Sequence, residues 1–319
     1  MRARLPTLSP HTYQRVAEAA LAALFLIVLT GAAVRLTGSG LGCPDWPKCY
    51  GRVAPPLQTH ALIEFGNRIL SGFVGIAAAA AGLLAWRRRP FRRDLALIGA
   101  LLPLGVLGQA VLGGFTVRNH LAPGFVMGHF GLSMIILVAA VTLAWRARYE
   151  AGERPRSGDR AAVSAVRALL PLGAVTIFLG TAATAAGPHA GGAGTDDIID
   201  RLEWRGIDTL DWAIHQHARL ATALGVAALG AWWLLGRRHA LPDARRALTV
   251  ACALLAAQAV VGGVQYVLEL PSEIVWIHVS FAAATWVVLL WATAAAGRVG
   301  PAAPATRPPA EREPAVAAR

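Results

Sequence analysis

The sequence predicts an all-α membrane protein whose eight transmembrane helices form two duplicated four-helix bundles. Its 319 residues are 55% hydrophobic and only 15% charged, whereas a typical soluble domain is roughly a quarter charged. The apolar residues also come in blocks of about 20, the length that crosses a bilayer as a helix. A repeat between the two halves of the chain is the third observation. Together these patterns exclude a soluble enzyme, a disordered protein and a disulfide-stapled secreted domain.

Eight apolar segments follow one another along the chain. None alternates in the manner of a barrel strand, and all are rich in Ala, Gly and Leu, which favours close packing of helices in lipid. The tail at 297–319, rich in Pro, Ala and charge, is predicted to be disordered. The predicted helices span 16–34, 61–86, 94–115, 124–145, 163–186, 210–235, 245–267 and 273–296.

The loops fall into two sets that predict the orientation of the helices. Those after the second, fourth and sixth segments are strongly basic, whereas those after the first, third, fifth and seventh hold few basic residues. Because cytoplasmic loops collect Lys and Arg, the basic set and both termini are predicted in the cytoplasm, in a multi-pass protein of the cell membrane. The net charge of +12 then belongs to loops beside the lipid bilayer, and we expect no nucleic-acid partner.

The first segment is expected to be an uncleaved helix after a cytoplasmic N-terminus at 1–15, because no small-residue cleavage site follows it. The outside loop at 36–59 contains Cys43 and Cys49 in the string GCPDWPKC. An oxidising compartment favours a disulfide between them. The alternatives are a metal site, for which two cysteines without a nearby histidine are a poor ligand set, and two free thiols, which this compartment disfavours.

The second segment carries a carboxylate, Glu64, roughly two turns into the span. An ionisable side chain inside a span is costly and is a functional candidate by default. A carboxylate there can exchange protons or hold a reaction intermediate. The structural alternative is an ion pair with Arg68, four residues further on the same helical face. We favour the functional interpretation, because a buried ion pair is an unfavourable way to pack a helix.

Three histidines lie at a common depth on segments that enter the membrane from outside. His129, His217 and His278 each lie six or seven residues past the start of their segment, roughly 10 Å below the outer boundary. Imidazoles on separate helices at one depth suit axial ligation of haem iron, although a lone membrane histidine is also typical of a packing residue. We expect His217 and His278 to hold one haem, and His129 to supply a ligand in the N-terminal bundle. His215 is two residues from His217, so only one of them can face the core, and the depth favours His217.

Three arginines are candidate partners for haem propionates or for other charges. Arg35 and Arg118 lie at outer helix ends, and Arg68 lies beside Glu64. Arginine binds carboxylates through two parallel hydrogen bonds. The alternative for the two at the helix ends is that their charged groups snorkel to the interface.

The two halves of the chain match at an offset of 149 residues. The string GQAVLGGFTV pairs with AQAVVGGVQY, and twenty residues separate Gln from His in both halves. The repeat predicts two parallel units, an N-terminal bundle at 16–150 and a C-terminal bundle at 160–296. The offset drifts to 151 between Arg68 and Arg219. The matched residues are Gly31 with Gly180, Gly38 with Gly187, Gln109 with Gln258, Gly113 and Gly114 with Gly262 and Gly263, and His129 with His278.

In its motifs the chain resembles the haem A synthase family over nearly all of residues 15–296. Each motif is weak alone, but the set is specific. The motifs are LTGSGLGCPDWPKCYG after the first segment, EFGNR on the second, GQAVLGGFTV and GHFGLS on the third and fourth, AAGPHAG after the fifth, HQHARL on the sixth, and QAVVGGVQY and IHVSFA on the seventh and eighth.

The resemblance implies an enzyme that oxidises the C8 methyl group of haem o to the formyl group of haem a, by successive hydroxylation and loss of water, for use in cytochrome oxidase. It also implies haem o synthase and an electron donor as partners, while a homo-oligomer stays open. The family's site residues correspond to His217 and His278 for a bis-His haem b, His129 for the iron of the haem o substrate, Glu64 for the essential carboxylate, and Cys43 and Cys49 for paired cysteines that serve reduction or architecture.

The second segment departs from the family pattern Glu-x-x-His-Arg, because Asn67 stands where the family has an iron ligand. Two explanations stay open. Either His60, one turn before Glu64 on the same face, replaces that ligand with a haem nearer the outside, or the substrate haem is five-coordinate on His129. The alternative function is a membrane cytochrome b-type electron-transfer protein without its own substrate. Glu64 and the cysteine loop argue against it, because pure electron transfer needs neither.

Overall fold

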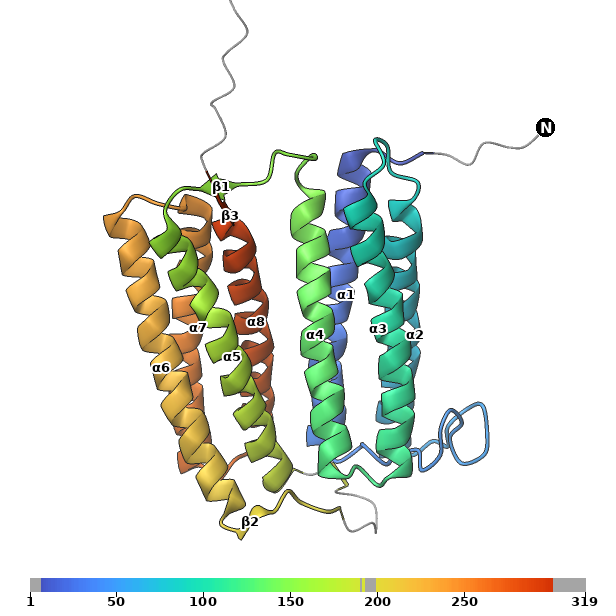
Figure 1. Ribbon diagram of the computed structural model, residues 1–319. Helices are drawn as coiled ribbons and strands as arrows, with labels where there is room; N and C mark the ends of the chain where they lie inside the picture. The colour runs from blue at the N-terminus through green and yellow to red at the C-terminus, as the bar shows by residue number, and fades with distance from the viewer. Residues whose placement is uncertain (1–6, 190, 193–198, 301–319) are drawn as a thin grey trace, which may run out of the picture.

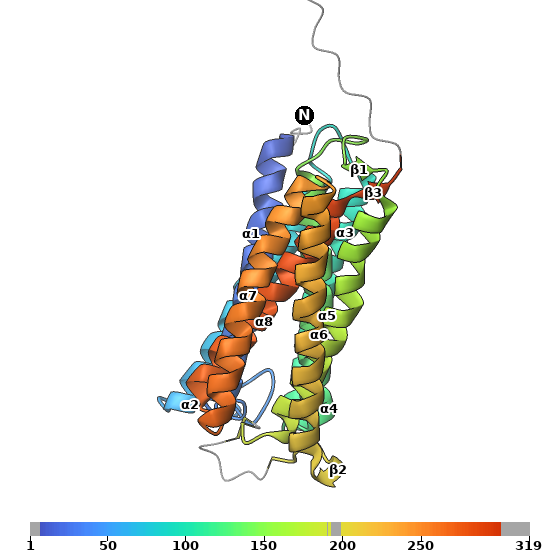
Figure 2. The ribbon, with the colours of Figure 1, turned by 90° about the vertical axis from the view of Figure 1, so that its left-hand side faces the viewer.

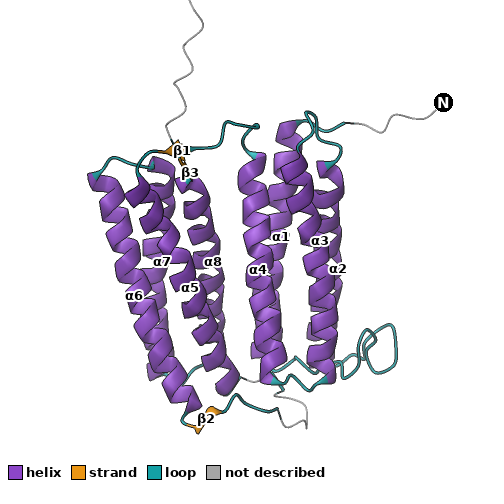
Figure 3. Cartoon of the chain, viewed as in Figure 1, coloured by secondary structure: helices purple, strands orange, loops and turns teal. Residues whose placement is uncertain are grey.

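The computed structural model describes residues 7–189, 191–192 and 199–300, which are mostly helical (Figure 1, Figure 3). Each of eight helices in this part of the chain is long and apolar enough to cross a membrane, so the predicted all-α membrane fold is confirmed. The helices are α1 (Pro10–Leu36), α2 (Thr59–Ala85), α3 (Arg93–Arg118), α4 (Pro123–Ala147), α5 (Arg160–Ala186), α6 (Thr209–Arg237), α7 (Pro242–Val267) and α8 (Ser272–Ala296). The short strands are β1 (Arg156–Ser157), β2 (Trp204–Ile207) and β3 (Arg298–Val299).

Helix α1 begins at Pro10, earlier than the predicted start at 16. Ser9 caps it, because its Oγ accepts a hydrogen bond from Thr12 N at 3.1 Å. Pro10 stands in the first turn, where a helix does not use the backbone N–H that proline lacks. The polar residues of this turn hide it from a hydropathy pattern, yet Tyr13 is fully buried and donates from its hydroxyl to Ala81 O at 3.0 Å.

The helices form two four-helix bundles that lie side by side (Figure 1). Helices α1 to α4 contact one another in a closed ring in chain order, and α5 to α8 form a second such ring. Helix α8 contacts α1 and α4, and α4 also contacts α5, so the bundles join along these four helices. Figure 2, turned by 90°, shows that the helix axes of both bundles are roughly aligned.

Tryptophans of α8 tie the two bundles together. Trp286 Nε1 donates to Met134 O on α4 at 3.0 Å, and Trp276 Nε1 donates to Leu29 O on α1 at 2.9 Å. Trp286 is buried, and a buried indole needs such a partner for its N–H. The buried core of α1 to α4 continues onto α8 through Trp286 and Leu290. The bundles therefore share a core along their contact.

The turns that join α3 to α4 and α7 to α8 have the same backbone geometry. His120 and Leu121 have φ values of 48° and 58°, and Glu269 and Leu270 have values of 60° and 65°. Leu121 N and Leu270 N each donate to the carbonyl five residues earlier, at 2.9 and 2.8 Å. Residues other than glycine rarely adopt positive φ, so two consecutive ones at matched positions fit the predicted duplication.

The molecule has two ends of different character (Figure 1). We call the end that carries the loop at 37–58 the disulfide end; α2, α4, α6 and α8 begin there. The opposite end, where α1 begins and α8 ends, is the arginine end. It carries the basic loops at 86–92, 148–159 and 238–241.

The C-terminal tail starts with an ordered strand, which corrects the prediction of disorder from 297 onward. Strands β1 and β3 pair in parallel, and Arg298 N donates to Pro155 O at 3.1 Å. Gly297 leads into β3 with φ at 70°, and a Cβ there would lie 2.3 Å from Pro155 O. Glycine is required at such an approach. The rest of the predicted disordered tail, from 301, lies outside the described residues.

Candidate functional site

Three histidines near the disulfide end each pack against a glycine of a neighbouring helix. His129 and His278 lie six residues after the first residue of α4 and α8, so they share one register. The pairs, with the distance from an ideal glycine Cβ to the ring Cε1, are Gly113 and His129 (3.3 Å), Gly180 and His217 (2.8 Å), and Gly262 and His278 (3.2 Å). A methyl group at any of the three glycines would press on the ring, so glycine is what lets each imidazole sit close to the next helix.

The rings of His217 and His278 lie close together between α6 and α8. Their centroids are 6.0 Å apart and their planes are inclined at 68°. His217 Nδ1 donates to Thr176 O on α5 at 2.8 Å. Because a carbonyl oxygen only accepts, Nδ1 carries the hydrogen and Nε2 keeps a free lone pair. A metal atom bound between two imidazoles, with bonds of about 2 Å on each side, needs ring centroids roughly 6 Å apart, so the spacing of this pair suits a shared metal atom.

Two glutamines join the helices that carry these histidines to their neighbours. On α3, Gln109 Nε2 donates to His129 O at 2.9 Å. On α7, Gln258 with its amide nitrogen facing α8 donates to His278 O at 3.1 Å, and its oxygen accepts from Ala282 N at 3.0 Å. The same nitrogen is 3.1 Å from His278 Nδ1. Ligation of a metal through Nε2 would place the ring hydrogen on Nδ1, so the amide of Gln258 would turn its oxygen toward this nitrogen. The twenty-residue spacing between Gln and His thus reflects a hydrogen bond from each glutamine to the neighbouring helix. The spacing was visible in the sequence, but sequence reasoning did not assign this contact to it.

Two further histidines lie apart from this arrangement. His215 is exposed, and its Nδ1 is 2.8 Å from Asp211 O on its own helix. His60, in the first turn of α2, shares a hydrogen bond of 2.9 Å with Ser39 Oγ. The structure therefore brings His217, and not His215, to His278, and it ties His60 to the loop after α1.

Four buried polar atoms on α1 to α4 have no hydrogen-bond partner among the described residues. They are Arg35 Nε, Asn67 Oδ1 on α2, Gln109 Oε1 and His129 Nδ1 on α4. Most buried polar atoms in folded proteins are paired. Asn67 and His129 lie on helices that face each other across the ring of the first bundle, so a ligand held between these helices would supply partners for both atoms.

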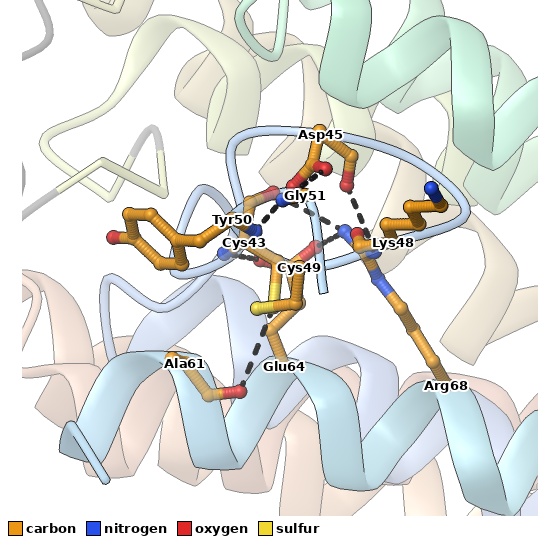
Figure 4. The surroundings of a disulfide bond; sticks show 9 residues. All are labelled: Cys43, Asp45, Lys48, Cys49, Tyr50, Gly51, Ala61, Glu64 and Arg68. Atoms are coloured by element: carbon orange, nitrogen blue, oxygen red, sulfur yellow. Dashed lines mark hydrogen bonds and ion pairs between the residues drawn. A yellow bond between two sulfur atoms is a disulfide. The ribbon is translucent and has the colours of Figure 1, made fainter. Parts of the chain in front are cut away.

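The predicted disulfide between Cys43 and Cys49 is present, and it lies against the first turns of α2 (Figure 4). Glu64 is only 6% exposed. Its Oε2 accepts a hydrogen bond from Cys43 N at 2.7 Å, and its Oε1 pairs with Arg68. The ion pair considered as the structural alternative is therefore present, and it also holds the disulfide loop.

Arg68 is the main anchor of this loop. Its guanidinium donates to the backbone carbonyls of Asp45 (3.0 Å), Lys48 (2.9 Å) and Cys43 (3.2 Å) as well as to Glu64 (Figure 4). Arginine suits this task because its donors spread in a planar fork. One side chain thus gathers both ends of the disulfide-closed turn onto α2.

The loop is also stabilised from within and from α3. The Asp45 carboxylate accepts hydrogen bonds from Gly51 N at 2.8 Å and from Tyr50 N at 2.6 Å, and these bonds lower the pKa of Asp45. Trp46 packs on Gly114 of α3, where a Cβ would lie 3.0 Å from the indole Cδ2. Gly114 follows Gly113, which packs against His129. The loop and the His129 ring therefore meet the same short stretch of α3.

Replacing Arg68 with alanine is expected to free the disulfide loop. The change removes three hydrogen bonds to loop carbonyls, each worth about 1 kcal/mol, and it leaves Glu64 without its cation. We expect a hydrophilic phosphine to reduce the disulfide at least about tenfold faster, measured by alkylation of the thiols and mass spectrometry. Arg118→Ala, at an exposed position at the end of α3, is the control. Equal reduction rates in the Arg68 variant and the unmodified protein would show that Arg68 does not anchor the loop.

The remaining candidate arginines occupy different environments. Arg35, near the end of α1, donates to Thr184 O on α5 at 3.2 Å and so links the two bundles. Its Nε is buried and has no hydrogen-bond partner within the described part of the chain. Arg118 is exposed at the last position of α3.

The fold and the site define a class of protein: a multi-pass helical membrane protein that gathers imidazoles from neighbouring helices near one end of two bundles. Within the described ranges no group of three or more His, Cys, Asp or Glu side chains could hold a metal ion. A bis-imidazole pair needs no third protein ligand if the metal arrives in a porphyrin, which supplies four nitrogens of its own.

Comparison with known proteins identifies the family. The profile of a family described as cytochrome oxidase assembly protein matches residues 14–290, and the chain belongs to this family. It is 35% identical over 130 residues to a heme A synthase of Lysinibacillus sphaericus (40% of this chain, 42% of the relative) and 32% identical over 174 residues to a heme A synthase of Shewanella oneidensis (48% and 49%). The resemblance seen in the motifs is thereby confirmed.

A third relative has a different name. The chain is 30% identical over 279 residues to a protoheme IX farnesyltransferase of Thermus thermophilus, and the alignment covers 83% of this chain but 45% of that protein. In all three comparisons the chain spans a little under half of the relative's length.

Proposed function

We propose that this chain acts as a haem A synthase, which converts haem o to haem a. The C8 methyl group of haem o is oxidised to a formyl group: two hydroxylations place two hydroxyl groups on one carbon, and loss of water follows. The family membership and the names of the relatives support this reaction. The observation that carries the proposal is the His217–His278 pair, whose ring centroids lie 6.0 Å apart and in which Nε2 of His217 keeps a free lone pair.

In the C-terminal bundle His217 and His278 would hold the iron of haem b. A haem with two imidazole ligands supplies a six-coordinate centre for electron transfer. The protein's own part is to orient the rings. Thr176 O keeps the hydrogen of His217 on Nδ1, and the amide of Gln258 lies beside Nδ1 of His278.

In the N-terminal bundle His129 would bind the iron of the haem o substrate. Trp46 of the disulfide loop packs on Gly114, next to the glycine that packs against His129. Glu64 accepts a hydrogen bond from the same loop. A carboxylate, a disulfide and an imidazole thus share one end of one bundle. This arrangement supports a role for Glu64 in holding or moving a proton near the substrate, with Arg68 as the group that sets its charge.

For the haem propionates we favour Arg35 over the other two candidates. Arg68 is already bonded to Glu64 and to the loop, and Arg118 is exposed. The buried Nε of Arg35 has no partner among the described residues, and a carboxylate would supply one.

We also propose the orientation and partners of the chain. The arginine end, with both termini, would lie in the cytoplasm and the disulfide end outside the cell membrane, because Arg-rich loops stay inside and a disulfide persists in an oxidising compartment. The N-terminal bundle at 16–150, with its loop at 36–59, would be the substrate unit and the bundle at 160–296 the haem b unit. The farnesyltransferase name of the Thermus relative supports haem o synthase as a partner, beside an electron donor.

The test is to purify the protein after co-expression with haem o synthase, in air and with a reductant, and to separate the extracted haems by chromatography. Haem a or its hydroxymethyl intermediate is expected. Haem o alone, beside a stable low-spin haem b, would favour an electron-transfer protein without its own substrate. Absence of all haem would contradict both functions.

Replacing the glycines beside the rings with alanine is expected to weaken the binding of haem b. The effect should be largest where the added Cβ lies closest to a ring. An alanine Cβ would lie 2.8 Å from His217 at Gly180, 3.2 Å from His278 at Gly262, and beyond 4 Å from any described neighbour at Gly263. Overpacking costs about 1–3 kcal/mol, so Gly180→Ala is expected to lower haem b occupancy at least about fivefold. Gly262→Ala should be intermediate and Gly263→Ala unchanged. Absorbance of the reduced protein per mole of chain measures this; equal occupancy in all three would disprove the packing.

A further inference from the structure

The first bundle repeats the glycine–histidine packing of the second bundle on one side and lacks it on the other. In the α5–α6 pair, Gly180 packs against His217. In the α1–α2 pair, Gly31 matches Gly180 in the repeat, and Asn67 corresponds to His217 by its position along the helix. Asn67 and His217 each lie eight residues after the threonine that begins their helix, Thr59 and Thr209. An amide therefore takes the position of an imidazole.

The space at this position differs accordingly. A Cβ on Gly180 would lie 2.8 Å from His217 Cε1, whereas a Cβ on Gly31 would meet no heavy atom of the described chain within 4 Å. The shorter side chain of Asn67 does not fill the place beside Gly31. Its Oδ1 is nevertheless buried, and it has no hydrogen-bond partner in the described residues.

On the opposite side of the first bundle, the packing matches that of the second bundle. His129 packs on Gly113, as His278 packs on Gly262, and its helix is bonded through Gln109. The imidazole of His60, seven residues before Asn67 on α2, bonds to Ser39 Oγ and lies nearer the disulfide end. Haem iron in proteins is held by His, Cys, Met or Tyr side chains, and an asparagine amide is not among these ligands.

We propose that the first bundle ligates its haem from one side only, through His129, and that Asn67 faces the open axial position with an amide able to hydrogen-bond a small molecule there. This inference rests on the proposed function, because it needs a haem in the first bundle. It selects five-coordination over ligation by His60. The protein then carries two unlike iron centres: a closed one on His217 and His278, and an open one on His129.

Carbon monoxide tests the open position, since it binds reduced haem that has a free axial site. The protein is purified with its haems after co-expression with haem o synthase. We expect one low-spin and one high-spin haem by electron paramagnetic resonance, and one carbon monoxide bound per two haems. Asn67→His should supply the missing imidazole, convert the second haem to low spin, and lower carbon monoxide binding at least tenfold. Asn119→His, at the end of α3, is the control and should change neither signal.

The outcomes separate this proposal from the proposed function. Two low-spin haems in the unmodified protein, neither of which binds carbon monoxide, would overturn the open site; loss of one low-spin signal in His60→Ala would then identify His60 as the ligand. A single haem that persists in His129→Ala would contradict the haem o site itself, and the open site with it. If Asn67→His does not fold, the carbon monoxide stoichiometry of the unmodified protein and of His60→Ala still decides the question.

Discussion

Replacing His278 with alanine is expected to remove the low-spin haem from the purified protein. His217 would remain held by Thr176 O, but one imidazole cannot give a six-coordinate, low-spin iron. Changes in the surroundings of a metal ligand already lower metal binding or activity by about 10- to 100-fold, so loss of the ligand itself should exceed that. Electron paramagnetic resonance of the oxidised protein and the haem content per chain measure the effect.

Two control variants sharpen this experiment. His215→Ala removes an exposed imidazole two residues from His217 and should leave the low-spin signal intact. His129→Ala should also preserve that signal, because His129 lies in the other bundle. A low-spin haem that survives His278→Ala at full occupancy would refute the assignment of ligands, and its loss in His129→Ala would mean that the halves have been exchanged.

Glu64→Ala is expected to abolish conversion of haem o to haem a while the low-spin haem b remains. The carboxylate lies in the first bundle and bonds to Cys43 N and Arg68, far along the chain from both haem b ligands. A positioned proton-transfer group contributes about 10²–10⁴-fold to a rate, so we expect at least a hundredfold less haem a per haem by chromatography.

The Glu64→Gln variant separates a chemical role from an architectural one. Glutamine can still accept the hydrogen bond from Cys43 N, but it carries no charge and cannot act as an acid or base. Recovery of haem a with Gln would indicate that Glu64 only holds the loop; inactivity of both variants would support proton transfer. Glu18→Ala removes a carboxylate paired with Arg148 at the arginine end and should not affect conversion.

Most of the fold could be predicted from the sequence, because the length and apolar composition of a segment indicate whether it spans a membrane. The eight helices follow from the length of the apolar segments, and the Cys43–Cys49 disulfide follows from the compartment. The start of α1 was missed, because capping by Ser9 and burial of Tyr13 extend the helix beyond its apolar stretch. The order at 298–299 was missed because it depends on pairing with β1, far back in the chain.

The site could be predicted only as candidate residues. The Glu64–Arg68 pair is visible as an i, i+4 spacing, but the bonds from Arg68 to three loop carbonyls join segments about twenty residues apart. Gly113, Gly180 and Gly262 stood out in the repeat without a role, because a sequence does not show which side chain on the next helix a glycine will meet. The contact between Gln109 and His129 was hidden for the same reason.

The central idea is that His217 and His278, on two helices of one bundle, ligate haem iron. Near-infrared magnetic circular dichroism of the oxidised, unmodified protein tests it most directly. This method reports the two axial ligands of a low-spin haem. A band typical of bis-imidazole ligation, present at one haem per chain, is the predicted result. A colourless protein, or a band typical of histidine with methionine or of any other ligand pair, would contradict it.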